Sequence, residues 1–142
     1  INGQEIECSV LGNENPMASI VGEIVPKNDF YSYKAKYIDE DGAALLIPVR
    51  LSKTISKKVQ NLAIKVFQTL NCEGMGRVDF FVKKNGEVIV NEINTIPGFT
   101  AISMYPKLWE ASGIPLSKLL DRLIELAIER FERESKLKTT VK

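Results

Sequence analysis

Four polar side chains meet on one predicted β-hairpin near the middle of this chain of 142 residues. The dipeptide Asn85-Gly86 lies between two apolar runs, which is typical of a two-residue type I′ turn because both residues tolerate positive φ. This turn places Asp79 opposite Glu92. It also places Arg77 opposite Asn94, and because side chains alternate along a strand, all four emerge on one face.

Two carboxylates directly opposite each other repel, so the pair Asp79–Glu92 needs a compensating charge. A cation between them is one answer, and two carboxylates with the amide of Asn94 are the oxygen ligands that suit Mg²⁺. The alternative is that these residues only line a solvated face of the sheet. The metal interpretation depends on the register, because a slip of one residue would turn Asp79 to the other face.

The opposite face of the hairpin is apolar and is expected to pack on helices. The type I′ register assigns to this face the side chains of Val78, Phe80, Val82, Ile89 and Ile93. Phe81 and Val90 fall on the acid-bearing side. There they form either an apolar floor beneath a purine ring or a part of the ordinary core.

A loop follows the hairpin and adds two candidate site residues. Residues 94–100 read NTIPGFT, and the Pro and Gly indicate a loop. Because Gly98 has no side chain, its backbone N–H can come close to a ligand. Ser103 stands where the next helix is expected to begin, so it is a candidate N-cap, a role that is compatible with ligand binding.

The composition is that of an ordinary globular domain, with 44% hydrophobic and 26% charged residues. A formal net charge of +1 gives no electrostatic reason to bind nucleic acid or a membrane surface, and no apolar run is long enough to span a bilayer. The absence of histidine excludes Ser-His and Cys-His nucleophiles. Cys8 and Cys72 lie in apolar segments without metal-ligand spacing, which indicates reduced core residues of a cytoplasmic protein.

Further strands and an aromatic loop are expected before the hairpin. Residues 4–11 and 18–25 read as strands around a turn, and 44–49 is a short apolar run. Residues 27–40 are rich in Phe, Tyr and Lys without a helical or strand period. A loop this aromatic is expected to pack against the protein or to close over a site.

Apolar spacings of three and four predict a helix from Ser52 or Thr54 to about residue 71, and a short helix over 104–112. A third helix is expected to have Pro115 at its first position. Its predicted buried stripe consists of Leu116, Leu119, Leu120, Leu123, Ile124, Ala127, Ile128 and Phe131. Together the elements predict an α+β fold, an antiparallel sheet flanked by helices that cover one of its faces.

The stretches RVDFFV and NEINTIPGFTAISMYP resemble the C-terminal part of the D-alanine–D-alanine ligases, members of the ATP-grasp superfamily. The resemblance is dense in these motifs and looser over nearly the whole chain, and it implies the C-terminal portion of an ATP-grasp domain. It implies that Asp79, Glu92 and Asn94 hold two Mg²⁺ ions, for which Mn²⁺ can substitute, and that these ions bridge the phosphates of ATP. Arg77 and the backbone N–H of Gly98 match groups that stabilise the tetrahedral intermediate.

The aromatic stretch FYSYKAKY resembles the mobile loop that covers the ligase active site. Lys36 matches the lysine that contacts the transferring phosphate, Tyr37 matches a tyrosine that orients the second substrate, and Phe30 matches a residue near the adenine. Ser103 matches the residue that holds the carboxylate of the second D-alanine. Glu5 matches a position near the ribose of ATP, although a solvated glutamate on an edge strand explains it equally well.

The resemblance also implies an activity, the ATP-dependent joining of two D-alanines through an acyl phosphate for peptidoglycan synthesis. The parent enzyme is then a cytoplasmic homodimer without nucleic-acid or membrane partners. Residues 1–142 are expected to be one subdomain of that longer ligase, since the chain begins without Met and shows no glycine-rich phosphate loop. Two alternatives stay open: another ATP-grasp carboxylate–amine ligase with a different amino acid, and an isolated domain that is inactive by itself.

Overall fold

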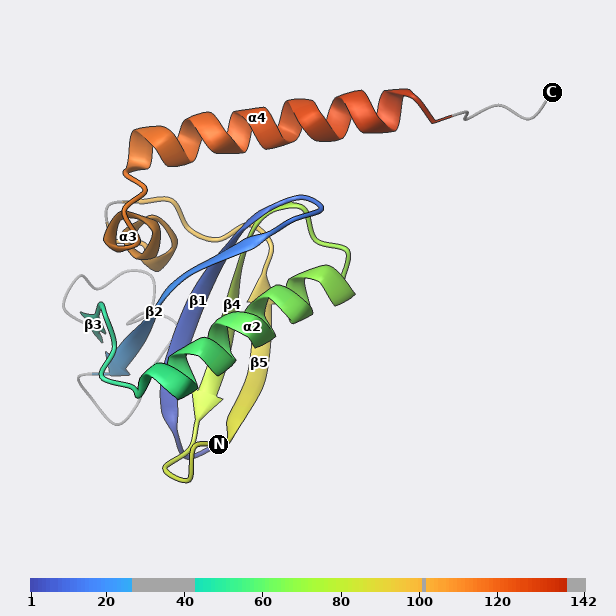
Figure 1. The fold of residues 1–142 in the computed structure, drawn as a ribbon. Helices are drawn as coiled ribbons and strands as arrows, with labels where there is room; N and C mark the ends of the chain where they lie inside the picture. Colours follow the sequence, from blue (N-terminus) through green and yellow to red (C-terminus); the bar gives the residue numbers. More distant parts are fainter. Residues whose placement is uncertain (27–42, 101, 138–142) are drawn as a thin grey trace.

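The computed structural model describes residues 1–26, 43–100 and 102–137, which form an α+β fold (Figure 1). An antiparallel sheet has the strand order β3-β2-β1-β4-β5. Its strands are β1 (Gln4–Gly12), β2 (Met17–Pro26), β3 (Ala43–Leu46), β4 (Gly74–Val82) and β5 (Val88–Asn94). The helices are α2 (Lys53–Thr69), α3 (Met104–Ala111) and α4 (Leu116–Ser135), and none of these is long and apolar enough to cross a membrane. The predicted fold class, an antiparallel sheet flanked by helices, is confirmed.

Helix α2 backs the sheet, as its apolar spacing predicts. Ser52 is the N-cap, and its hydroxyl accepts the Ile55 N–H at 3.3 Å. The buried face of α2 packs on a core of side chains from β1 and β4 that consists of Ile6, Cys8, Val10, Val78, Phe80 and Val82. Leu70 belongs to the predicted stripe but is 57% exposed, because it is the C-cap residue, where the helix ends.

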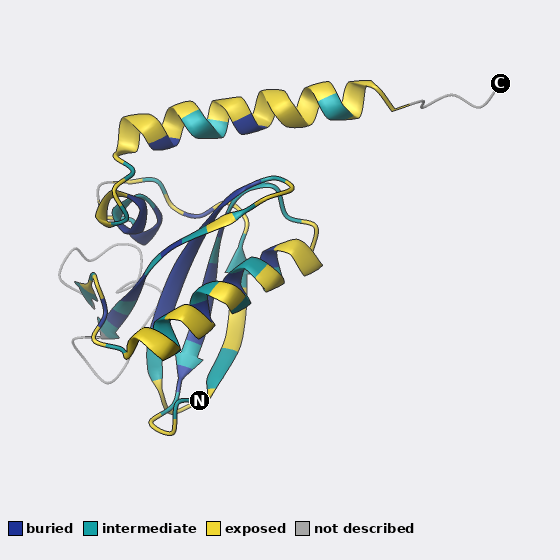
Figure 2. Ribbon diagram, in the orientation of Figure 1, coloured by how far each residue is buried: buried dark blue, intermediate teal, exposed yellow. Residues whose placement is uncertain are grey.

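The helices cover both faces of the sheet, which corrects the expectation that they lie on one. Ile6 and Phe80 face α2, whereas Leu11 and Met75 pack with Tyr105 of α3. Because consecutive side chains of a strand point to opposite faces, α2 and α3 lie on opposite sides of the sheet. Strand β1, which is buried along most of its length, runs between them (Figure 2).

The hairpin turn differs from the prediction. The Lys83 N–H donates to the Glu87 carbonyl at 2.9 Å and the Gly86 N–H to the Lys83 carbonyl at 2.9 Å, so the loop contains three residues and not two. Of the pair Asn85-Gly86, only Gly86 has a positive φ, at 81°. The predicted type I′ turn is therefore wrong, and the turn is a type I turn followed by a glycine in the left-handed region.

A β-bulge restores the predicted register farther from the turn. Next to the turn every pair is shifted by one residue relative to the predicted register, so that Phe80 pairs with Val90 and not with Asn91. Asp79 nevertheless pairs with Glu92, because Asn91 is an extra residue on β5. The two displacements of one residue cancel, and the predicted neighbours of Asp79 across the hairpin are confirmed.

The shifted pairs change which side chains of β5 are buried. Val88 and Ile93 pack against the α2 core, whereas Ile89, which was expected there, pairs with Phe81. Val90, which was expected beside Phe81, is 37% exposed. The apolar neighbour of Phe81 on β5 is therefore Ile89.

Helix α4 packs along a narrower line than the sequence predicts. Pro115 is its N-cap, so the helix begins one residue later than expected. Leu119 and Leu126 are buried against a cluster that also contains Leu11, Tyr105 and Trp109. The other side of the helix is exposed (Figure 2), and the exposed part of the predicted stripe consists of Leu116, Leu120, Ile124, Ala127, Ile128 and Phe131. The prediction of one wide buried stripe is wrong.

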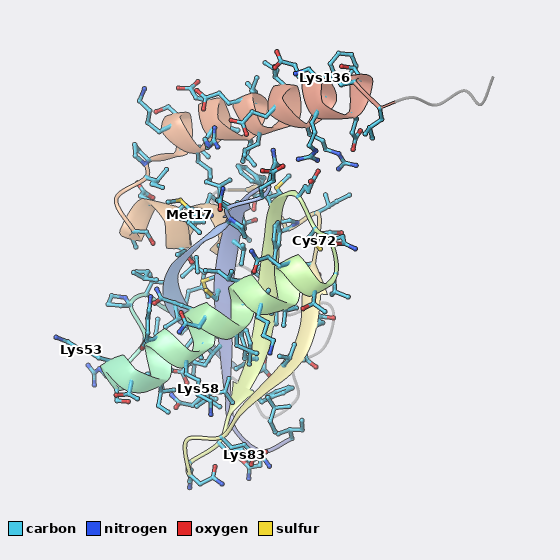
Figure 3. The ribbon with its side chains drawn as sticks, turned by 45° about the vertical axis from the view of Figure 1, so that its right-hand side comes forward. Met17, Lys53, Lys58, Cys72, Lys83 and Lys136 are labelled. Carbon is cyan, nitrogen blue, oxygen red and sulfur yellow. The ribbon has the colours of Figure 1, made fainter. Side chains whose placement is uncertain are left out.

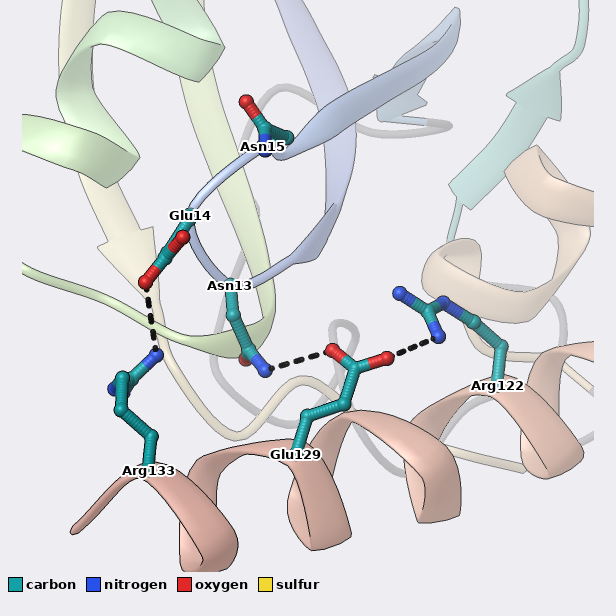
Figure 4. Close-up of a pocket in the computed structure, with 6 residues that line it drawn as sticks. All are labelled: Asn13, Glu14, Asn15, Arg122, Glu129 and Arg133. Carbon is teal, nitrogen blue, oxygen red and sulfur yellow. Dashed lines mark hydrogen bonds and ion pairs between the residues drawn. The ribbon is translucent and has the colours of Figure 1, made fainter. Parts of the chain in front are cut away.

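Polar contacts join α4 to the β1–β2 turn around a pocket of about 330 Å³ (Figure 4). The pocket is lined by Asn13, Glu14, Asn15, Arg122, Glu129 and Arg133. Asn13 donates from Nδ2 to the Leu126 carbonyl at 3.0 Å and accepts the Gly74 N–H at 3.1 Å, which links α4, the turn and β4. The pocket lies beyond the end of β1 at Gly12, which is five residues from Glu7, roughly 16 Å at the rise of an extended strand.

Candidate functional site

The face of the sheet opposite α2 carries three rows of side chains across β1, β4 and β5, which together we call the acid face. The middle row is Glu7, Asp79 and Glu92, which are consecutive partners across the three strands. The rows on either side are Ser9–Arg77–Asn94 and Glu5–Phe81–Ile89. The four predicted hairpin side chains are thus brought together, and β1 adds two further acids, Glu5 and Glu7, to the same face.

Asp79 is fixed between Arg77 and Asn94. The Asp79 residue is 6% exposed. Arg77 donates from Nε to Oδ1 at 2.8 Å and from Nη2 to Oδ2 at 2.9 Å, and Asn94 donates from Nδ2 to Oδ2 at 3.1 Å. The two bonds from Arg77 form a bidentate, charge-assisted pair, which is the strong kind of hydrogen bond. Asp79 therefore has a single well-defined orientation on the acid face.

Glu7 is the acid that the sequence analysis missed. It is 2% exposed, and its Oε2 lies 3.0 Å from Arg77 Nε, the nitrogen that also donates to Asp79. The alternation of residues 4–11 places Glu5 and Glu7 on one face, which was a usable signal. The partner of a strand is not contained in its own sequence, however. Of the two interpretations of Glu5, the solvated glutamate on an edge strand is wrong, because β1 lies in the middle of the sheet and Glu5 is half-buried.

The donor chemistry of the acid face fits a hard divalent cation. An ionised carboxylate only accepts hydrogen bonds, so Asn94 presents its NH₂ group to Asp79 and keeps Oδ1 for another partner. An ionised carboxylate has about four lone-pair positions, and three of those on Asp79 accept hydrogen bonds here. One position on Asp79 would remain for a metal beside the exposed Glu92. Among the described residues, no three Asp, Glu or Cys side chains form such a site by themselves.

The loop between β5 and α3 holds Gly98 against Ser103. A Cβ atom at Gly98 would lie 2.9 Å from Ser103 Oγ, so the missing side chain permits this contact. Ser103 is the N-cap residue of α3, as predicted, but its hydroxyl does not cap the helix. It accepts the Thr100 N–H at 2.9 Å and lies 2.9 Å from Thr100 Oγ1. The first N–H groups of α3 are therefore left without a cap from Ser103, which favours an anion at this helix end.

Helix α3 begins beside the acid face because β2 has a glycine there. Gly22 pairs with Glu7 across β1 and β2. A Cβ atom at Gly22 would lie 2.9 Å from Leu108 Cδ2 and 3.1 Å from Met104 Sδ, so α3 packs directly on the backbone of β2. This close packing places the first turn of α3, and Ser103 before it, next to the row that contains Glu7.

Two predicted nucleotide contacts, Glu5 and Phe81, are partners across β1 and β4 and are both half-buried. Ile89 completes their row on β5. Phe30, Lys36 and Tyr37 lie outside the described residues, so their predicted roles stay predictions.

Neither cysteine belongs to the site. Both thiols are free. Cys8 is buried in the α2 core, and this burial raises the pKa of its thiol to about 12. Cys72 is half-buried, and burial raises the pKa of its thiol as well. It lies at the opposite end of the sheet from Lys83, which marks the hairpin turn (Figure 3).

The fold and the acid face together define the C-terminal part of an ATP-grasp domain. The family model described as D-ala D-ala ligase C-terminus matches residues 1–125, and the chain belongs to this family.

Named relatives agree with this assignment. The chain is 60% identical over 141 residues to a protein named D-alanine--D-alanine ligase from Shouchella clausii, and the match covers 99% of this chain and 38% of the relative. The solved structure of the D-alanine-D-alanine ligase from Coxiella burnetii is 52% identical with a TM-score of 0.84, over 96% of this chain and 35% of that one. The structure of the Bacillus anthracis D-alanine--D-alanine ligase complexed with ATP is 33% identical with a TM-score of 0.75, over 94% and 42% of the two chains. The chain therefore spans well under half the length of these relatives.

Proposed function

We propose that this chain supplies the nucleotide, metal and second-substrate side of a D-alanine–D-alanine ligase. The reaction is the ATP-dependent joining of two D-alanines for peptidoglycan synthesis in the cytoplasm. One observation carries the proposal: Asp79 and Glu92 are directly opposed, with Arg77 and Asn94 as the adjacent pair, in a chain whose family model and named relatives are ligases of this kind.

The reaction has two steps. The carboxylate of the first D-alanine attacks the γ-phosphorus of ATP, which forms an acyl phosphate and releases ADP. The amine of the second D-alanine then attacks the acyl carbon, loses a proton, and expels phosphate. Both steps develop negative charge on oxygen atoms, so a protein promotes them mainly by position and electrostatics.

The proposed metal ligands are Asp79, Glu92 and Asn94. Two Mg²⁺ ions, or Mn²⁺ in their place, would neutralise charge on the phosphate oxygens. The donor set supports this assignment. The three hydrogen bonds on Asp79 leave this carboxylate one position for a metal unless Arg77 or Asn94 moves. Asn94 would contact both the metal and the bound nucleotide.

Arg77 and the backbone N–H of Gly98 are the proposed donors to the tetrahedral intermediate, where one such donor contributes about 3 kcal/mol. Ser103 and the uncapped N-terminus of α3 would hold the carboxylate of the second D-alanine. Glu5 and Phe81 would contact the ribose and the purine.

The remaining proposed contacts come from residues outside the described ranges. Phe30 would lie near the adenine, Lys36 would contact the transferring phosphate, and Tyr37 would orient the second substrate. We propose that the residues of a longer, homodimeric ligase complete the site, and that residues 1–142 alone release no phosphate.

A chimera tests the proposed function. Residues 1–142 replace the aligned part of the Coxiella burnetii ligase, and phosphate release is measured with ATP, Mg²⁺ and D-alanine. We expect activity within about tenfold of the parent, and its loss in a chimera with Asp79→Ala, since an electrostatic contribution of several kcal/mol disappears. The parent ligase and a thermal melt of each chimera are the controls.

Two outcomes would contradict the proposal. A folded chimera without D-alanine-dependent phosphate release would indicate a domain that keeps the fold without the activity. A chimera that prefers D-serine or D-lactate as the second substrate would indicate a related ligase with another acceptor. Product analysis by mass spectrometry separates this second case from the proposed dipeptide.

A further inference from the structure

The buried carboxylate of Glu7 has no assigned role in the proposed reaction, yet it contacts a residue that does. Its Oε2 lies 3.0 Å from Arg77 Nε, and the side chains of Glu7 and Arg77 are 3% and 12% exposed. We propose that Glu7 is a positioning residue that holds Arg77 in place when Asp79 is engaged by a cation. The role in catalysis rests on the proposed function, whereas the contact itself does not.

Asp79 faces two competing demands. In the structure it accepts two hydrogen bonds from Arg77, and as a proposed metal ligand it must also share its negative charge with a divalent cation. A cation bound to Asp79 repels the guanidinium and weakens this pair. An arginine that depended on Asp79 alone would then lose its orientation at the moment when the substrates are bound.

Glu7 removes this conflict because it reaches the same nitrogen from the neighbouring strand β1, whereas Asp79 is on the same strand as Arg77. Glu7 on β1 is the direct partner of Asp79 on β4, so the two carboxylates flank Arg77 Nε at 3.0 and 2.8 Å. The carboxylate of Glu7 is nearly inaccessible to water, which makes its attraction to the guanidinium stronger than that of a surface pair. The contact also has little freedom, since β1 lies in the middle of the sheet.

The test follows the Nε–H of Arg77 by ¹⁵N–¹H NMR in the 142-residue chain, and it needs neither metal nor activity. Four proteins are compared: the unmodified chain, Glu7→Gln, Asp79→Asn, and the double variant. Asp79→Asn removes the charge that a cation would compete for. We expect the Nε–H signal to stay at low field, with slow exchange with water, in each single variant, because one carboxylate remains.

In the double variant we expect this exchange to become at least about tenfold faster, the factor that corresponds to one lost charge-assisted hydrogen bond. Amide spectra and thermal melts show whether each variant is folded. If Asp79→Asn alone releases the Nε–H as fully as the double variant does, Glu7 does not hold Arg77 and the inference is overturned.

A further variant keeps the inference testable if the double variant does not fold. Glu7→Asp keeps the charge but shortens the side chain by one methylene, so in the Asp79→Asn background it is expected to release the Arg77 Nε–H. Retention of the slow exchange in Glu7→Asp with Asp79→Asn would show that charge near Arg77 suffices, and the positioning role would be refuted. Neither result depends on ligation, so failure here is distinct from failure of the chimera.

Discussion

Asp79 and Glu92 are predicted to differ sharply in what they do for stability, although both are proposed to bind the same cation. Asp79 is buried and accepts three hydrogen bonds, whereas Glu92 is exposed. Asp79→Asn removes the charge that Arg77 pairs with and turns an NH₂ group toward Arg77 or Asn94. Glu92→Gln removes only a charge that repels Asp79 across the strands.

The magnitudes follow from these contacts. A hydrogen bond to a charged group contributes about 1.5–3 kcal/mol, and breaking a buried pair costs up to about 5 kcal/mol. Because Glu7 still pairs with Arg77, we expect Asp79→Asn to lower the free energy of unfolding by about 2–4 kcal/mol. Glu92→Gln is expected to change it by less than about 0.5 kcal/mol, as for most surface substitutions.

Urea unfolding with and without Mg²⁺ measures both effects. A cation present at ten times its dissociation constant stabilises the folded chain by about 1.4 kcal/mol, and both variants should lose this increment. Glu87→Gln is a matched control, since Glu87 is another exposed glutamate of the same hairpin and should leave the response to Mg²⁺ unchanged. If Glu92→Gln destabilises the chain as much as Asp79→Asn does, or keeps the full response to Mg²⁺, the assignment of the two roles is incorrect.

Three further predictions concern the support of the site. Leu119→Ala should lower the free energy of unfolding by about 3–4 kcal/mol, because Leu119 is fully buried. Leu120→Ala, at a neighbouring position that is 45% exposed, should lower it by less than about 1.5 kcal/mol, and chemical denaturation compares the two variants. Gly22→Ala should lower the free energy of unfolding by about 1–3 kcal/mol, because the added methyl group overpacks against α3. A thermal melt detects this loss, and the chemical shifts of the first turn of α3 should change. Burial raises the pKa of the Cys8 thiol from 9.0 to about 12. Between these pH values the unfolded state releases a proton that the folded state retains. The contribution of the thiol to stability is therefore complete below pH 9 and is lost as the pH rises toward 12. The difference in stability between the chain and Cys8→Val should therefore change only above pH 9, and a thiol reagent at pH 8 should modify Cys72 before Cys8.

The sequence predicted the elements well where a local signal coincides with what the fold buries. In α2, the N-cap Ser52 and the apolar spacing identify both the start of the helix and its buried face. In α4 the same kind of spacing was misleading. An amphipathic pattern reports that a helix face is apolar, but only the packed structure decides which part of this face is covered. Leu126, which is buried, lay outside the predicted stripe, and Phe131, which is 71% exposed, lay within it.

The site was predicted in part for a similar reason. Asp79, Glu92, Arg77 and Asn94 lie on one hairpin, so the pairing of two adjacent strands was enough to group them. Glu7 comes from a strand that is more than 60 residues earlier in the chain, and its position depends on the pairing of β1 with β4. No local pattern encodes such a long-range pair. Ser9 and Gly22 were missed for the same reason.

The hairpin shows what fixes the register at the site. The turn was predicted with the wrong number of residues, which by itself would have turned Glu92 and Asn94 to the face that α2 covers, away from Asp79. The error has no effect there because the bulge at Asn91 shifts β5 back by one residue. The bulge lets Val88 and Ile93, five positions apart on β5, both pack against the α2 core, which an uninterrupted strand cannot do because its faces alternate. Burial on the α2 side therefore sets the register of Asp79 and Glu92, and the turn only closes the loop.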